Sequence, residues 1–82
     1  MIIRNNQELK MFEEALERCH HAVFLVTYRG DQYDLKDPSQ HAQGIEELLT
    51  ARGYQEPELF ANSPADEVEL FRFIIAQEKE VA

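Results

Sequence analysis

The 82-residue sequence predicts a single α+β domain, residues 1–82, with three helices packed on a three-stranded antiparallel sheet. The segment Ala22–Pro38 has the pattern of a buried strand, a turn, a second strand and a helix start. Amphipathic helical patterns flank it on both sides, and a short apolar run at residues 58–61 supplies a third strand. The expected element order is therefore α-β-β-α-β-α, with sheet order 2-1-3, which keeps the crossover right-handed.

The first helix is predicted over residues 6–20. Asn5 is suited to cap its amino end, and Glu8 stands at the capping-box position three residues on. The apolar residues of this segment fall on one helical face, which predicts an amphipathic helix packed on the sheet: Leu9, Phe12, Ala15, Leu16 and Cys19.

The hairpin is predicted around a two-residue turn at Gly30 and Asp31, where glycine tolerates a positive φ. This turn would pair Tyr28 with Tyr33 and Val26 with Leu35. The core face of the sheet would then carry Phe24, Val26, Tyr28, Tyr33 and Leu35. The back of the first strand, residues 22–28, would carry Val23, Leu25 and Thr27. That strand is apolar on both faces, so we expect it at the centre of the sheet.

The second helix is predicted over residues 38–52, with Asp37 as its cap, Pro38 at the first helical position and Gly53 after its end. Its apolar stripe is Ile45, Leu48 and Leu49. Gly44 lies inside this helix, where glycine costs about 1 kcal/mol relative to alanine. Close packing against a neighbouring element accounts for it; a bend or break in the helix is the alternative.

The third helix is predicted over residues 64–78, because Ser63, Pro64 and the acids Asp66 and Glu67 form a strong start signal. Its apolar residues cover more of the circumference than one core stripe needs. We expect the core face to be Val68, Phe71, Ile74 and Ile75. Leu70 and Phe73 would lie on the flanks, either within an extended core or on a surface for a partner.

The net charge, the number of cysteines and the length of the apolar runs limit the kinds of partner and location that the protein can have. The net charge is −8, which argues against binding to nucleic acid and to anionic membranes, because both need a basic surface. A single cysteine cannot form an internal disulfide, so a cytoplasmic location is expected. We find no signal peptide and no apolar run of membrane-spanning length.

Residues with reaction chemistry are few. Cys19, His20 and His21, with His41 elsewhere, are the metal candidates. Adjacent helical residues diverge by roughly 100°, so these side chains do not converge on one tetrahedral ion unless the helix ends there. The carboxylates follow helix surfaces and caps, without a recognisable acid–base pair. We therefore expect no catalytic residues, no metal site and no cofactor.

Three blocks of sequence carry a family resemblance: residues 8–10 with Cys19, residues 30–36, and residues 58–61 with Asp66 and Glu67. They resemble a group of short uncharacterised bacterial proteins with a G-D-x-[FY]-[ND]-L-K turn, an E-L-F strand and an acidic helix start. Some members carry a poly(A) polymerase label. This chain has neither the glycine-serine loop nor the paired aspartates that a nucleotidyltransferase needs. The resemblance implies the fold and no catalytic residue.

These features favour a non-catalytic cytoplasmic module that binds a protein partner or a second copy of itself. Its surface would use Leu70 and Phe73, or the back of the sheet at Val23 and Leu25. An acidic inhibitor that mimics nucleic acid on a basic enzyme is the first alternative, and it requires one continuous acidic face. A small enzyme or ligand-binding protein is the second, and it requires a pocket lined by the tyrosines or by His20, His21 and His41.

Overall fold

All six predicted elements are present and follow one another in the predicted order. The computed structural model describes residues 3–51 and 55–81, with side chains as far as Gln77. The elements are α1 (Asn6–Arg18), β1 (Val23–Val26), β2 (Gln32–Asp34), α2 (Pro38–Thr50), β3 (Glu58–Ala61) and α3 (Pro64–Val81). Both outer strands are antiparallel to β1, and the sheet order is β2-β1-β3. The predicted class and strand order are confirmed.

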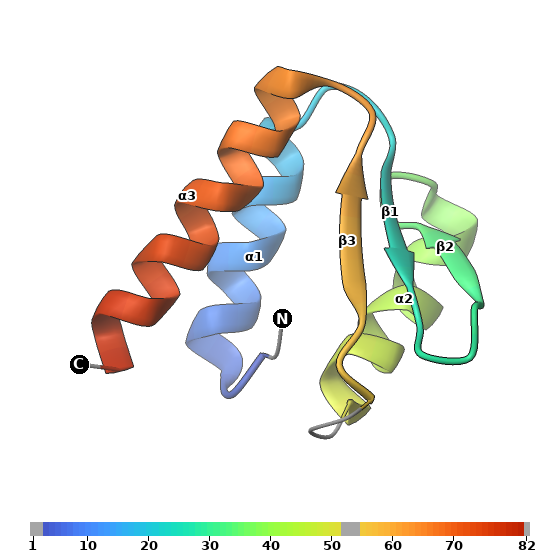
Figure 1. Ribbon diagram of the computed structural model, residues 1–82, viewed down its shortest axis with the longest axis horizontal. Coiled ribbons are helices and arrows are strands. Elements are labelled where there is room, and N and C mark those ends of the chain that lie inside the picture. The colour runs from blue at the N-terminus through green and yellow to red at the C-terminus, as the bar shows by residue number, and fades with distance from the viewer. Residues whose placement is uncertain (1–2, 52–54, 82) are drawn as a thin grey trace.

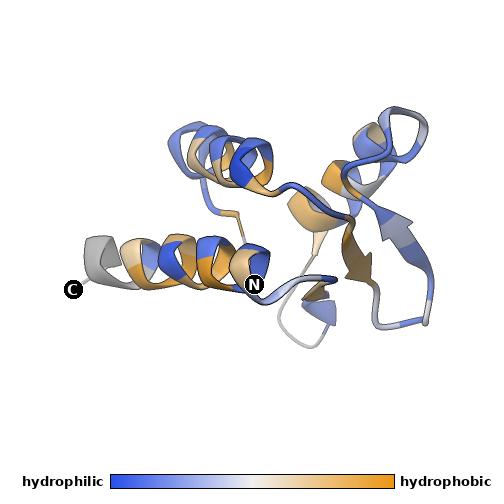
Figure 2. Ribbon diagram, turned by 90° about the horizontal axis from the view of Figure 1, so that it is seen from above, coloured by the Kyte–Doolittle hydropathy of each residue, from blue (hydrophilic) through white to orange (hydrophobic). Residues whose placement is uncertain are grey.

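Helices cover one face of the sheet. In Figure 1, α2 lies behind the sheet, whereas α1 lies behind α3, and α3 runs beside the edge strand β3. Figure 2 shows from above that α1 and α2 lie on the same side, with α3 level with the sheet. None of the described elements covers the sheet face that is nearest the viewer in Figure 1. The shortest dimension of the molecule is 19 Å, as expected for one helix layer of about 10 Å on one sheet.

The core lies between the sheet and the helices. Its fully buried side chains include Phe12 of α1, Leu25 of β1 and Leu48 of α2. The rings of Phe12 and Phe73 pack at 5.5 Å between centroids and an interplanar angle of 56°, a favourable tilted geometry that joins α1 to α3.

The predicted turn and register of the hairpin are wrong. Val26 pairs with Gln32 and Leu25 pairs with Tyr33, so the loop is longer than expected. Thr27 N–H donates to Asp31 O at 2.8 Å, and Gly30 N–H donates to Thr27 O at 2.9 Å. Gly30 has φ +90°, so it is the left-handed last residue of a three-residue loop, not the first residue of a two-residue turn.

This register exchanges the two faces of β1, because the pairing shifts by an odd number of residues. Val23, Leu25 and Thr27 are buried under the helices, whereas Phe24 and Val26 are only partly buried on the other face. Tyr33 of β2 and Leu35, which follows the strand, face the core as predicted.

Helix caps agree with the sequence prediction better than helix ends do. Asn5 Oδ1 accepts from Glu8 N–H, and Asp37 Oδ1 accepts from Ser39 N–H, both at 2.9 Å. Helix α1 ends at Arg18 and α2 at Thr50, each two residues earlier than predicted. The predicted cap at Gly53 lies outside the described residues.

Gly44 packs closely, as predicted, and α2 runs through it without a break. A Cβ atom at this position would overlap Leu35 Cδ2 and lie 3.3 Å from Tyr33 Cβ. The glycine therefore lets α2 approach β2.

The predicted core face of α3 is wrong at three of its four residues, and the fourth, Ile74, is partly buried against the core as predicted. Leu70 and Phe73 are buried, whereas Val68, Phe71 and Ile75 are exposed. The buried stripe begins and ends with polar residues, Asp66 at 1% exposure and Gln77 at 8%. Both polar side chains form hydrogen bonds in the core, so they can be buried. The apolar pattern alone did not predict that this face of α3 is the buried one.

Candidate functional site

The four residues expected to bind a partner are part of the core. Val23 and Leu25 are fully buried, and Leu70 and Phe73 are 5% and 4% exposed. They present no surface to another molecule, and the interaction surface expected on them is not there. A surface for a partner must therefore consist of other residues, namely those that point outward in the observed register of β1 and on the exposed face of α3.

Six apolar residues lie on the side of the molecule that no described helix covers, and we call them the open face: Phe24, Val26, Phe60, Val68, Phe71 and Ile75. On the sheet, Phe24 lies directly opposite Phe60 in the β1–β3 register, and Phe60 is 51% exposed. On α3, Val68 is 50% exposed and Phe71 is 62% exposed. Exposed fractions of this size are typical of surface residues and not of core residues.

Helix geometry places the two halves of the open face on the same side. Phe73 packs on Phe12 of α1, and α1 lies behind α3 in Figure 1. Phe71 and Ile75 are about half a helical turn around from Phe73, so they point away from α1, toward the viewer. Phe24 and Phe60 point away from the helix layer as well, because their neighbours Val23 and Leu59 face it.

Among the described residues, the charges at the edge of the open face are mainly acidic. Glu58 and Glu67 are exposed beside Phe60 and Val68. Arg72 is also exposed, and its Nη1 lies 3.9 Å from Glu69 Oε1, a loose ion pair on the same helix. An apolar centre with a polar rim is typical of a protein interface.

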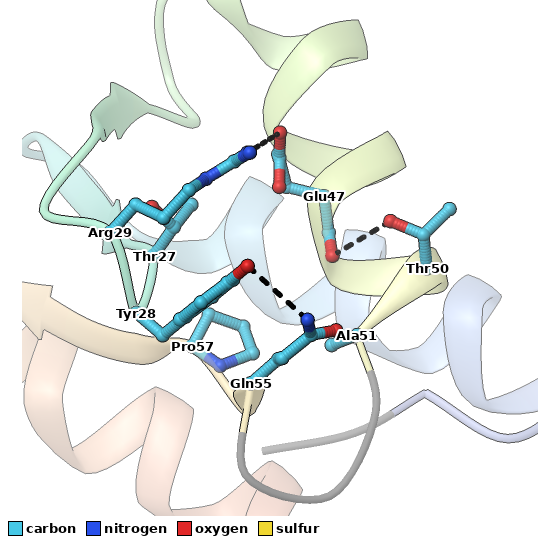
Figure 3. A pocket seen from close by; sticks show the side chains of 8 residues that line it. All are labelled: Thr27, Tyr28, Arg29, Glu47, Thr50, Ala51, Gln55 and Pro57. Atoms are coloured by element: carbon cyan, nitrogen blue, oxygen red, sulfur yellow. Dashed lines mark hydrogen bonds and ion pairs between the residues drawn. The ribbon is translucent and has the colours of Figure 1, made fainter.

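A polar pocket of about 220 Å³ lies between the hairpin loop and the end of α2 (Figure 3). Arg29 stacks 5.6 Å from the centroid of Tyr28, and its Nη2 lies 3.5 Å from Glu47 Oε1. Gln55 Nε2 donates to the Tyr28 hydroxyl at 3.2 Å. These groups bind one another, and the pocket is smaller than the roughly 300 Å³ typical of ligand sites. They join the hairpin loop to α2.

A second hollow, of about 440 Å³, lies between α1 and α2, and His41 is among the residues that line it. His41 Nδ1 lies 2.8 Å from Leu35 O, so this nitrogen carries the proton, and Nε2 lies 3.5 Å from Glu13 Oε1. Lys36 Nζ donates to Leu16 O at 2.6 Å, at the end of α1. Among the residues that line this hollow there is no hydroxyl or thiol nucleophile for the histidine to activate.

The Cys19–His21 segment has a structural role centred on Asp66. Burial raises the pKa of the Cys19 thiol, and the Asp66 charge adds to that effect, which makes the thiol a weak nucleophile. Asp66 accepts from His20 N–H at 3.0 Å and from His21 N–H at 2.9 Å. Burial opposes ionisation of Asp66, but these two bonds hold its pKa below the usual value. Among residues 3–51 and 55–77, no three metal-ligating side chains are grouped.

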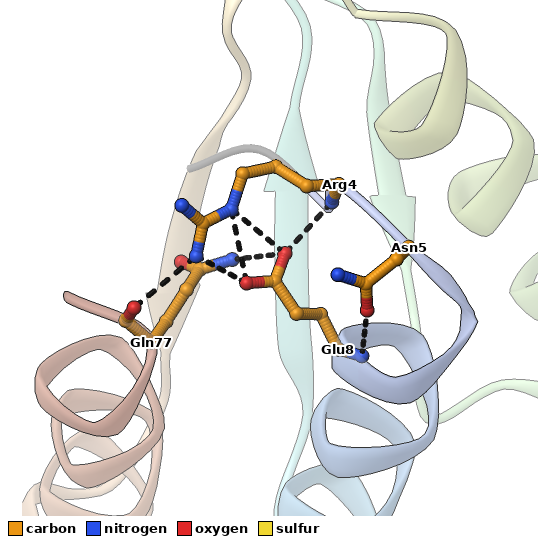
Figure 4. A network of polar contacts seen from close by, with 4 residues as sticks. All are labelled: Arg4, Asn5, Glu8 and Gln77. Carbon is orange, nitrogen blue, oxygen red and sulfur yellow. Dashed lines mark hydrogen bonds and ion pairs between the residues drawn. The ribbon is translucent and has the colours of Figure 1, made fainter. Parts of the chain in front are cut away.

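Glu8 forms a second buried polar network, which the sequence did not reveal beyond a capping role (Figure 4). The carboxylate is 2% exposed and forms an ion pair with the Arg4 guanidinium. Gln77 Nε2 donates to Glu8 Oε1 at 3.2 Å, and Arg4 Nη2 donates to Gln77 O at 3.1 Å. The bond from the Arg4 side chain is the main reason that the pKa of Glu8 falls to about 2, although burial opposes it.

Many acids have partners within the chain, so they do not act as a free acidic surface. Glu13 lies beside His41, Glu47 beside Arg29, and Glu69 Oε2 accepts from Arg18 Nε at 2.8 Å. Asp37 caps α2, and the bond from Ser39 N–H lowers its pKa. No observation on the described residues favours the nucleic-acid mimic over the other expectations.

Comparison with known proteins found no match among protein families, curated proteins or solved structures. Within the described part of the chain, no helix has the length and apolar character to cross a membrane. The open face is therefore the candidate functional site on its geometry alone.

Proposed function

We propose that this protein is a non-catalytic binding module whose open face contacts another protein chain. The observation that carries the proposal is the apolar character of the one side that no described helix covers. Phe60 and Phe71 are each more than half exposed, and aromatic residues dominate the binding energy of protein interfaces. The chain has one cysteine and hence no internal disulfide, which supports a reducing compartment such as the cytoplasm.

The corrected hairpin register supports this surface on the sheet. A sheet with helices on one side alternates apolar residues inward and polar residues outward. Here the outward positions of β2 are polar, Gln32 and Asp34, but those of β1 are Phe24 and Val26. The fold of one chain does not require apolar residues there, whereas a contact with a second chain does.

Variants with a charge in the open face test the proposal. Phe60→Glu and Phe71→Glu place a carboxylate at its two most exposed aromatic positions. The immobilised wild-type chain is expected to retain a protein from the lysate of its host, and both variants are expected to lose it. The loss of one aromatic anchor costs about 2 kcal/mol or more, roughly a 30-fold loss of affinity.

Leu49→Glu is the matched control, because Leu49 is 43% exposed on α2, on the helix-covered side of the sheet. Circular dichroism of all three variants establishes that the fold is intact. If Phe60→Glu, Phe71→Glu and Leu49→Glu retain the same proteins as the wild type, the open face is not a binding surface.

A further inference from the structure

We propose that the exposed stripe of α3 pairs with the same stripe of a second copy of this chain, the two helices running parallel about a two-fold axis. This inference rests on the proposed function, because it names the occupant of part of the open face. The stripe consists of Val68, Phe71 and Ile75, all exposed on the far side of α3 from its core residues.

The spacing of the stripe is that of a coiled-coil seam. Its residues are three and four positions apart, so Val68 and Ile75 take the a positions of a heptad and Phe71 the d position. In parallel pairs, β-branched residues at a favour two strands, and both a positions here are β-branched. The buried stripe of α3, with Leu70 and Phe73, remains packed on α1.

Charges beside the seam favour the parallel orientation. Glu67 precedes Val68 at the g position, and Arg72 follows Phe71 at the e position. In a parallel pair, a g residue faces the e residue five positions on in the other helix, so Glu67 of each copy faces Arg72 of the other. Within the described part of the chain, Arg72 has a loose 3.9 Å contact with Glu69 and its side chain is 72% exposed, so it can reach across.

The net charge of −8 does not oppose this contact strongly, because many acids lie away from it. Glu13 and Glu14 are on α1, which lies behind α3, and Glu46 is on α2, which lies behind the sheet. The molecule is 19 Å thick, and exposed charges are largely screened beyond about 8 Å at physiological salt.

The size of the contact indicates that α3 does not act alone. A stable dimer buries about 800 Å² on each partner, more than two helical turns provide. The broad side of the molecule measures 34 by 28 Å, so it has room for a contact of that size. The remaining area must come from residues that flank the stripe on the same side of the molecule.

Sedimentation equilibrium of the purified full chain tests this inference. The wild-type mass is expected to rise with concentration from 9.6 kDa toward twice that value. Phe71→Glu and Arg72→Glu are each expected to raise the dimer dissociation constant by about tenfold or more. The double variant Glu67→Arg with Arg72→Glu exchanges the two charges, and it is expected to restore dimerisation, as only a parallel pair would.

Leu49→Glu is again the control, and it should dimerise like the wild type. The inference is overturned if the wild type stays at 9.6 kDa at millimolar concentration, if Phe71→Glu dimerises as well as the wild type, or if the charge exchange fails to restore dimerisation lost in Arg72→Glu. A monomeric wild type whose lysate partner is lost in Phe71→Glu would refute the dimer and leave the proposed function standing.

Discussion

At the scale of single residues, the carboxylate of Glu8 links the stability of the fold to pH. Its pKa is lowered from 4.5 to about 2, chiefly by the bond from the Arg4 side chain. The folded value lies below the ordinary one, so the folded state favours the ionised form. The contribution to the free energy of unfolding is therefore complete above pH 4.5 and is lost as the pH falls through 2.

Replacing Glu8 with glutamine should remove this contribution. A shift from 4.5 to about 2 corresponds to an upper limit of about 3 kcal/mol, and the partly exposed Arg4 reduces it. Glu8→Gln should lower the free energy of unfolding at neutral pH and flatten its pH dependence between 4.5 and 2. Urea denaturation at several pH values measures both effects. Glu14→Gln, exposed on the same helix, is the control; an unchanged pH dependence in Glu8→Gln would refute the role of Glu8.

At the scale of elements, Gly44 sets the distance between α2 and β2. Helix propensity alone predicts that Gly44→Ala stabilises the protein by about 1 kcal/mol. The added methyl group would overlap the buried Leu35 and crowd Tyr33, and overpacking of this kind costs about 1–3 kcal/mol.

We therefore expect Gly44→Ala to lower the free energy of unfolding by about 1 kcal/mol. Glu46→Ala, at an exposed position of the same helix, should change it by less than about 0.5 kcal/mol. Thermal or urea denaturation measures both variants. A gain in stability for Gly44→Ala would show that α2 and β2 separate easily and that the glycine is not needed for their packing.

Elements that depend on local sequence could be predicted, and those that depend on tertiary pairing could not. Asn5 and Asp37 cap their helices because each side chain accepts from a backbone N–H only two or three residues away. The hairpin register depends on whether Gly30 closes a two-residue or a three-residue loop, and both loops suit glycine. That one choice decided which face of β1 lies in the core.

At the scale of the whole molecule, the candidate site could be located only after the faces were known. The sequence predicted correctly that β1 is apolar on both sides and that α3 has an apolar excess. It assigned the wrong side to β1 because the hairpin loop is one residue longer than expected, and the wrong side to α3 because Asp66 and Gln77 were not expected in the core. Each error swaps the buried face of an element with its outward face. The outward residues, Phe24 and Phe71 among them, are therefore ones that had been expected in the core.

The two faces of α3 can be distinguished by their effect on the stability of a single chain. Phe73 is 4% exposed and packs on Phe12, so Phe73→Ala should cost about 3–5 kcal/mol, and Phe73→Leu less. Phe71 is 62% exposed, so Phe71→Ala should change the free energy of unfolding by no more than about 0.5 kcal/mol. Urea denaturation at low protein concentration keeps association out of the measurement.

Equal losses in Phe71→Ala and Phe73→Ala would place Phe71 in the core and remove the open face from α3. A loss confined to the Phe73 variants would show that Phe71 contributes little to the stability of the single chain, which leaves it available for contact with a second one.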